Sequence, residues 1–325
     1  MEGTKMLNKT FQELLIQLDK LTFTQSKQAL NHLSHKCSIE TLENITPDVE
    51  SCPHCQSHSI HKWGVRSNIQ RYRCKECHKS FNALTKTPLA RLRHKESWLN
   101  YAKDLIDGES IRESAKHCHV DKSTTFRWRH KMLQIPIALK AQHLHGVVEF
   151  DETYFLESHK GERHLERKPR TRGGKATKRG ISSEQIAVLI VRDRNGNTTD
   201  AILEQSNQNS IGEVLLPVLD KDALLCSDSK PSYKAFAQNA HFTLETINVS
   251  AKEHVRDGVF HVQNVNAYDS RLKEWMKHFH GVATKYLNSY LGWMRLLDRE
   301  KSITAKELLG VISGRKMMLQ PLMRT

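Results

Sequence analysis

The sequence predicts a modular α/β protein, in which a small metal-binding domain and two short helices precede a larger domain of alternating strands and helices. Three observations support this prediction: two Cys-x-x-Cys pairs near residue 60, a helix-start signal at residue 110, and alternating strand and helix patterns after residue 145. A length of 325 residues suits two or three folded units. We expect boundaries at 1–48, 49–85, 95–137, 145–300 and 301–325, the first and last segments being helical.

The composition indicates a polyanionic partner. Lys and Arg number 50 against 36 Asp and Glu, a formal charge of +14, and positive surplus of this size favours binding to phosphate-rich polymers. Lys5, Lys9 and Glu13 interrupt the start of the chain, and no run of about 18 apolar residues occurs, so we expect neither a signal peptide nor a membrane span. DNA, RNA and an anionic membrane surface remain candidate partners at this point.

Near the N-terminus, residues 10–35 carry an apolar stripe at helical spacing, from Phe11 through Leu14, Leu15 and Leu18 to Leu21. We expect a helical pair that packs on the four-cysteine domain or on another subunit, and we assign it no chemistry.

Four cysteines have the spacing of a zinc ribbon. Cys52 and Cys55 form one pair, Cys74 and Cys77 the other, and 18 residues separate the pairs. Two such pairs at this separation are typical of one tetrahedral Zn²⁺ held by four thiolates, with Trp63, Gly64, Tyr72 and Arg73 in two short strands between them. The alternative is a pair of redox motifs, but the βαβ context of such motifs is missing. Cys37, Cys118 and Cys226 are expected to be small buried hydrophobic residues.

Residues 97–134 show the pattern of a helix-turn-helix. Ser110 and Glu113 form a capping box that opens one helix, a turn follows near 119–122, and a second helix runs from about Ser123 to Leu133. The second helix would be the recognition helix in a major groove. It would face DNA with Lys122, Ser123, Thr124, Arg127 and His130. A plain helical hairpin is the alternative.

A strand with carboxylates on one face opens the larger domain. Residues 147–155 alternate, which places Glu149, Asp151 and Thr153 on the polar face. The loop from Lys160 to Gly180 has nine Lys and Arg against two Glu, half of the surplus charge of the chain. We interpret it as a DNA-clamping loop rather than an ordinary solvated face, with DNA contacts from Arg170, Arg172, Lys178 and Arg179.

The elements that follow predict a mixed sheet. Strands at 185–191 and 199–203 flank an Asn-Gly hairpin turn, a helix capped by Ser210 follows, and then come a strand at 223–227, a helix from Pro231, a strand at 241–249 and a helix at 265–279. This order fits a ribonuclease-H-like topology.

Two aspartates in this domain are candidate metal ligands. Asp151 lies on the first strand and Asp228 at the end of a later one, and Mg²⁺ binds carboxylate oxygens that converge from separate elements. On the last helix Asn266, Asp269 and Lys273 share one face. Asn266 offers a carbonyl oxygen to metal and Lys273 a charge to phosphate. The structural alternatives are helix capping by Asp228 and Asn266, a first-turn acid in Asp269, and a surface carboxylate in Asp151.

Together these motifs resemble the insertion-sequence transposases of the "fifteen-ninety-five" family, also called ISXO-two-like. The resemblance rests on the zinc ribbon, the helix-turn-helix, Asp151-Glu-Thr-Tyr154, Ser227-Asp228 followed by Tyr233, and Asn266 with Lys273 seven residues later. The segment Gly281–Trp293 is also similar to the family's sequence after the catalytic helix. The resemblance covers about residues 10 to 300.

The resemblance implies a DDE-type transposase with a ribonuclease-H-like catalytic domain of the retroviral-integrase type. Its catalytic residues would be Asp151, Asp228, Asn266 and Lys273, an Asp-Asp-Asn-Lys variant in which Asn replaces the usual third Glu, so that either Asn266 or Asp269 supplies the third metal ligand. The implied cofactors are catalytic Mg²⁺ or Mn²⁺ and structural Zn²⁺. The implied reaction is hydrolysis at the transposon end followed by attack of the freed 3′-hydroxyl on target DNA.

The implied partner is double-stranded DNA, both transposon ends and target, bound by a homo-oligomer without a membrane. The implied location is the bacterial cytoplasm, at the nucleoid. Two other classes compete with this hypothesis. A non-catalytic DNA-binding regulator would have lost polar catalytic positions, and all four are present. An RNA-processing nuclease would place base-stacking aromatic residues in an exposed sheet or loop, and the basic loop has none.

Overall fold

The computed structural model describes residues 2–46, 48–67, 69–165, 167–170, 174, 176–178, 180–248 and 255–314. They form two compact units. The first contains the described residues of Met1–Asp107, Ser114–Asp121 and Thr304–Met317, and the second those of Gly108–Glu113 and Lys122–Ile303. In the described residues no helix is long and apolar enough to cross a membrane.

The first unit contains several helices and a small sheet. Its helices are α1 (Glu2–Leu18), α2 (Phe23–Ile45), η1 (Lys95–Ser97), α3 (Trp98–Ile106) and α11 (Ala305–Ile312), and α2 and α3 both pack on α11. The predicted N-terminal helical pair is confirmed. The first part of its apolar stripe is open, because Phe11 is 54%, Leu14 47% and Leu15 38% exposed, whereas Leu18 and Leu21 are half-buried. Within the described residues this first part is therefore not covered by the four-cysteine domain.

The sheet of this unit has three antiparallel strands where the sequence predicts two. The strands are β1 (Ile60–Arg66), β2 (Ile69–Cys74) and β3 (Ser80–Asn82), in that order. The third strand forms because Phe81 is buried opposite Tyr72 and stacks on its ring at 5.9 Å. A three-residue strand is too short to give a periodic signal in the sequence.

The second unit contains a mixed five-stranded sheet. Its strands are β4 (Val147–Leu156), β5 (Gln185–Asp193), β6 (Thr198–Leu203), β7 (Leu224–Asp228) and β8 (Leu244–Ile247), arranged in the order β6-β5-β4-β7-β8. The pairs β4–β5 and β5–β6 are antiparallel, and β4–β7 and β7–β8 are parallel. The mixed α/β architecture predicted from the sequence is thereby confirmed.

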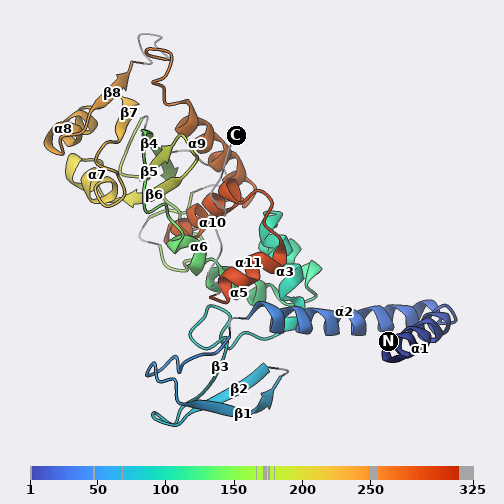
Figure 1. Cartoon of the computed structure of the whole chain (residues 1–325). Helices are drawn as coiled ribbons and strands as arrows, with labels where there is room; N and C mark the ends of the chain where they lie inside the picture. The colour runs from blue at the N-terminus through green and yellow to red at the C-terminus, as the bar shows by residue number, and fades with distance from the viewer. Residues whose placement is uncertain are drawn as a thin grey trace. The chain divides into compact units, whose positions relative to one another are not determined.

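Helices cover both faces of this sheet (Figure 1). Val148 and Phe150 of β4 face α7 (Gln208–Leu215) and α8 (Pro231–Asn239). On the opposite face, Val188 and Ile190 of β5 pack with α9 (Gln263–Lys277) and α10 (Leu287–Arg299). Because side chains alternate along a strand, Glu149 and Asp151 lie on the α9 face.

Three local expectations differ from the structure. Helix α7 starts at Gln208, because Asn207 rather than Ser210 is its N-cap and accepts the Ser210 N–H at 3.0 Å. The strand expected at 241–249 is confined to β8, and position 249 lies outside the described residues. Cys118 and Cys226 are buried as expected, but Cys37 is exposed on α2, so its expected burial is wrong.

The segment 281–293 contains a close helix contact. Gly292 of α10 lies against α6 (Gln134–Ala138), and a Cβ added at Gly292 would come within 2.7 Å of backbone atoms of Pro136 and Ile137. A side chain at this position would push the two helices apart, so glycine is required there for packing.

Candidate functional site

The four cysteines converge on one point. Their ligand atoms all lie within 4.8 Å of one another, and the Sγ–Sγ distances for Cys52–Cys77 and Cys55–Cys74 are both 3.6 Å. A tetrahedron with Zn–S distances of about 2.3 Å has sulfur atoms about 3.8 Å apart, so the cluster is compatible with Zn²⁺. The predicted four-cysteine group is therefore brought together by the structure.

Backbone amides support these sulfur atoms. The N–H of His54 donates to Sγ of Cys52 and the N–H of Glu76 to Sγ of Cys74, both at 3.4 Å. The pKa of Cys74 is lowered to about 7, with a backbone hydrogen bond from Cys77 as the largest cause. Both effects favour the thiolate, which is the form that binds metal.

Two short helices joined by a turn occupy the predicted DNA-binding segment. They are α4 (Ile111–His117) and α5 (Lys122–Met132), and the Ser110 hydroxyl accepts the Glu113 N–H at the start of α4. His119 in the turn has φ 53°, a left-handed conformation in which glycine is common. Lys122, Ser123 and Arg127 are exposed on α5, and Thr124 is half-buried.

The opposite side of α5 is anchored inside the second unit. Arg129 is fully buried, donates to the Glu109 carbonyl at 2.6 Å and lies 4.8 Å from the ring centre of Trp293. His130, predicted to face DNA, is instead half-buried and stacks on Tyr286 at 3.7 Å. The exposed candidates are therefore carried by a helix whose other face is fixed to α10 and the segment before it.

Asp151 and Asp228 lie on neighbouring parallel strands. The last pair in the β4–β7 register is Glu149 with Cys226, and Asp151 and Asp228 each lie two residues beyond this pair on their own strand. Asp151 Oδ1 accepts the Glu152 N–H at 2.7 Å, and Asp228 Oδ1 accepts the Lys230 N–H at 3.1 Å. Both side chains are partly buried, so each keeps open coordination capacity.

Several negative carboxylates act on one another around Asp151 and Asp228. The pKa of Asp151 is raised to about 6, first by burial and then by the negative charges of Asp228, Glu152 and Asp269. Burial and the charges of Glu152, Asp151 and Asp228 also raise the pKa of Tyr233, whose buried hydroxyl has no hydrogen-bond partner among the described residues. Carboxylates gathered in this way are costly to ionise unless a cation neutralises them.

Helix α9 brings three further predicted residues to this side of the sheet. Asn266 is exposed near its start, and Asp269 is half-buried with Oδ2 2.7 Å from Lys273 Nζ. The other oxygen of Asp269, Oδ1, is buried and accepts no hydrogen bond from any residue that the structure describes. The charge of Asp269 acts on Asp151, so the structure brings these two together.

This donor set suits a hard divalent cation. Aspartate oxygens from β4, β7 and α9 are the ligands that Mg²⁺ and Mn²⁺ prefer, and Oδ1 of Asp269 is an acceptor with unused capacity within the described part of the chain. Among the described residues, the cysteine group alone brings three or more ligand atoms within 4.8 Å. The carboxylates would therefore have to close in around a metal.

Sequence reasoning missed a polar network directly behind Asp151. The Glu152 side chain is buried on the α8 face, pairs with Lys230 Nζ at 2.5 Å and accepts from Ser206 Oγ at 2.6 Å and from the hydroxyl of Tyr154. Although burial opposes ionisation, hydrogen bonds from Lys230 and Ser206 lower the pKa of Glu152. The pair thus connects the strand of Asp151 to Lys230, whose backbone N–H donates to Asp228. Because Glu152 and Lys230 are 78 positions apart, local patterns gave no signal for it.

The basic loop is only partly available to a ligand. Arg170 donates to the Glu157 carbonyl at 2.5 Å and pairs with Glu184 at 3.1 Å, so its guanidinium is engaged within the chain. Lys178 is exposed. Arg172 and Arg179 lie outside the described residues. Arg170 therefore anchors the loop within the chain, whereas Lys178 is exposed to solvent.

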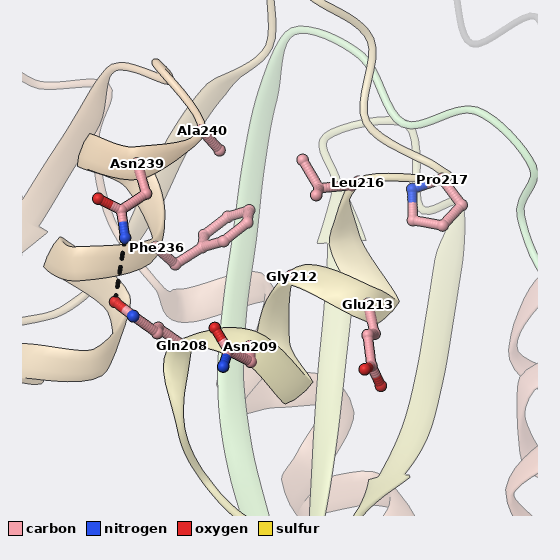
Figure 2. A pocket seen from close by; sticks show the side chains of 9 residues that line it. All are labelled: Gln208, Asn209, Gly212, Glu213, Leu216, Pro217, Phe236, Asn239 and Ala240. Carbon is pink, nitrogen blue, oxygen red and sulfur yellow. Dashed lines mark hydrogen bonds between the residues drawn. The ribbon is translucent and has the colours of Figure 1, made fainter.

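A pocket of about 490 Å³ lies elsewhere, between α7 and α8. Figure 2 shows Phe236 pointing between the two helices, with Asn239 donating to Gln208 at 3.2 Å on one side and Leu216 on the other. None of the predicted site residues lines it. Amide and apolar groups form most of its lining, which lacks the group of carboxylates found on β4 and β7.

A mixed sheet with carboxylates on two neighbouring parallel strands and on a helix that packs on the sheet is the arrangement of an α/β protein with an acidic site on its interior strands. Within this class, residues 143–295 match the family model of the ISXO2-like transposase domain. This match confirms, for residues 143–295, the resemblance found in the sequence.

Two other proteins are similar to the chain. An uncharacterized protein in the transposable element ISH50 of Halobacterium salinarum is 27% identical over 265 residues, which is 80% of this chain and 89% of the relative. The solved structure of a pre-cleavage Mos1 transpososome is 12% identical, covering 70% of this chain and 80% of that one, with a TM-score of 0.18. A TM-score this low does not indicate a shared fold.

Proposed function

We propose that the protein is a transposase that cleaves DNA at the ends of an insertion sequence and joins the freed ends to target DNA. The observation that carries this proposal is the gathering of Asp151, Asp228 and Asp269 inside the part of the chain that matches a transposase family. The strand order β6-β5-β4-β7-β8, with antiparallel pairing confined to β4–β5 and β5–β6, supports a ribonuclease-H-like domain of the retroviral-integrase type.

In this proposal the residues divide the work by their chemistry. Asp151 and Asp228 hold Mg²⁺ or Mn²⁺ between neighbouring strands, and the third oxygen comes from Asn266 or Asp269 on α9. When bound, the metals activate the attacking oxygen and stabilise the leaving oxygen of an in-line displacement. Lys273, an exposed cation paired with Asp269, contacts a DNA phosphate. The charge of Asp269 on Asp151 supports Asp269, whereas the family position supports Asn266.

The remaining modules bind DNA in this proposal. The ribbon within 49–85 carries structural Zn²⁺, the helices within 95–137 act as a helix-turn-helix, and 145–300 is the catalytic domain between helical segments 1–48 and 301–325. Joining needs two transposon ends in one complex, so the active form is a DNA-bound oligomer. The competing function is a DNA-binding regulator without cleavage activity.

Incubation with labelled DNA that spans each end of the element distinguishes the two functions. The transposase produces strand breaks at the element boundary with Mg²⁺ or Mn²⁺ and none in EDTA. Specific binding of the same DNA without breaks in either metal would support the regulator.

Arg127 tests the recognition helix. Because Arg127 is exposed on α5, Arg127→Ala should lower the preference for end DNA over random DNA by about 1–3 kcal/mol without lowering stability. Competition binding gives this ratio. Lys36→Ala, in an exposed pair on α2, is the matched control and should leave it unchanged. An unchanged ratio in Arg127→Ala would favour the helical hairpin.

The basic loop should act on all DNA sequences alike. Replacing Arg172, Lys178 and Arg179 with Ala should weaken binding of end and random DNA equally. The slope of log K against log salt should fall by about 0.9 for each phosphate that the variant no longer neutralises. Arg170→Ala is a separate variant, because Arg170 anchors the loop to Glu184. A slope equal to that of the wild type would show that the loop is an ordinary solvated surface.

A further inference from the structure

The helix that carries Asn266, Asp269 and Lys273 is capped from another strand. Helix α9 begins at Gln263, and its N-cap residue, Val262, has no side chain that could accept a hydrogen bond. Glu149 of β4 takes this role: its Oε2 accepts the N–H of Asn264 at 2.8 Å and of Val265 at 3.0 Å. These amides belong to the first turn, where helical N–H groups have no partner within the helix.

The contact is reinforced by further bonds. Oε1 of Glu149 accepts the side-chain amide of Asn264 at 2.8 Å, and the Glu149 side chain is fully buried. A negative charge at a helix N-terminus is also favoured by the helix dipole. Glu149 is therefore a charged cap, stronger than the neutral caps that Ser or Asn provide.

A guanidinium and an imidazole lie beside the buried carboxylate. Arg194, in the turn between β5 and β6, lies 3.3 Å from Oε1 of Glu149, and His261 lies 3.5 Å from the same atom. Arg194 also donates to the Val259 carbonyl at 2.8 Å. One carboxylate thus joins β4, the β5–β6 turn and the approach to α9.

The position of Glu149 links it to the acidic site. It precedes Asp151 by two residues on the same face of β4, and Asn264 precedes Asn266 by two and Asp269 by five on α9. Because β4 and α9 are rigid and are fixed to each other at the start of α9, they can move little relative to each other one helical turn further along. The cap therefore determines where Asp269 and Asn266 lie relative to Asp151.

We propose that Glu149 is a positioning residue that holds α9 against β4, so that the oxygen ligands on α9 meet those on β4 and β7 around one metal site. This inference rests on the proposed transposase function. It assigns Glu149 no contact with DNA or metal. It acts by fixing the position of α9 relative to β4. In metal sites, groups that hydrogen-bond to ligating side chains fix the ligands in a similar way.

Two readouts on Glu149→Gln test this role. Gln keeps the shape and one acceptor oxygen but removes the charge. The first readout is hydrogen exchange of the Asn264 and Val265 amides without DNA or metal, which should accelerate about tenfold or more. The second is the Mn²⁺ concentration for half-maximal end cleavage, which should rise about tenfold, with cleavage partly recovered at saturating Mn²⁺. Glu149→Ala should show larger effects in both.

Asp104→Asn is the matched control. Asp104 is a buried carboxylate of α3 whose Oδ1 lies 2.9 Å from Nδ1 of His117, on elements that carry none of the Glu149 contacts described above. It should lower the melting temperature yet leave both readouts at wild-type values. General loss of stability is thereby separated from displacement of α9.

The outcomes are separable. Unchanged exchange in Glu149→Gln would overturn the cap, and faster exchange with an unchanged Mn²⁺ requirement would overturn the positioning role. If the wild-type chain does not cleave end DNA in Mg²⁺ or in Mn²⁺, the proposed function fails, and the positioning role fails with it. The exchange readout would then still show whether Glu149 anchors α9. Faster exchange together with a raised Mn²⁺ requirement, both absent from Asp104→Asn, supports the proposal.

Discussion

Asp151→Asn and Asp228→Asn should each reduce cleavage of end DNA by about 10³-fold or more while end binding survives. Each change removes a charged ligand where dications and a phosphodiester must be held together. Gel-based cleavage and binding assays on the same DNA measure the two quantities. Asp222→Asn, an exposed carboxylate just before β7, is the matched control and should cleave like the wild type.

The same assay separates the two candidates on α9. If Asp269 supplies the third oxygen, Asp269→Ala abolishes cleavage and Asn266→Ala is nearly silent; if Asn266 supplies it, the pattern reverses and Asn266→Asp keeps some activity with Mn²⁺. Lys273→Ala should impair cleavage less than loss of the third metal ligand does, because its phosphate contact is one of several. Wild-type cleavage by Asp151→Asn or Asp228→Asn would contradict the role of these aspartates as metal ligands and end the mechanism as proposed.

Cys74→Ser should lose the zinc and unfold the ribbon within 49–85 while the α/β domain stays folded. The three-stranded sheet has a core of only Cys52, Cys74 and Phe81 among the described buried residues, so its folding depends on metal ligation, which supplies about 10–16 kcal/mol in small zinc domains. Metal content and hydrogen exchange of both units measure the effect. Cys37→Ser, at an exposed position on α2, should keep one zinc per chain. A full zinc equivalent and an intact ribbon in Cys74→Ser would contradict the structural zinc.

Local patterns in the sequence predicted the parts of the fold that local physics determines. The spacing of Cys52, Cys55, Cys74 and Cys77 directly predicts two metal-binding turns. The alternation at 147–155 correctly placed Glu149 and Asp151 on one face of β4. Pro231 marks the first residue of α8, as its missing N–H and fixed φ predict.

Long-range packing accounts for what the sequence could not reveal. The charge of Asp269 on Asp151 depends on how α9 lies on the sheet, and the Glu152–Lys230 and Glu149–Asn264 contacts join positions 78 and 115 residues apart. Arg170 was interpreted as a DNA contact because its loop is basic, but its guanidinium pairs with Glu184. Local sequence patterns likewise could not predict that His130 stacks on Tyr286, because this contact depends on the fold.

Asp151 and Asp228 hold the catalytic metals in the proposed function, and cleavage of end DNA by Asp228→Cys in Mg²⁺ and in Mn²⁺ tests this role most directly. A thiolate is a poor ligand for Mg²⁺ and accepts softer metals. We therefore expect no cleavage by this variant in Mg²⁺ and recovered cleavage in Mn²⁺. Wild-type cleavage by Asp228→Cys in Mg²⁺ would contradict the metal-binding role of Asp228.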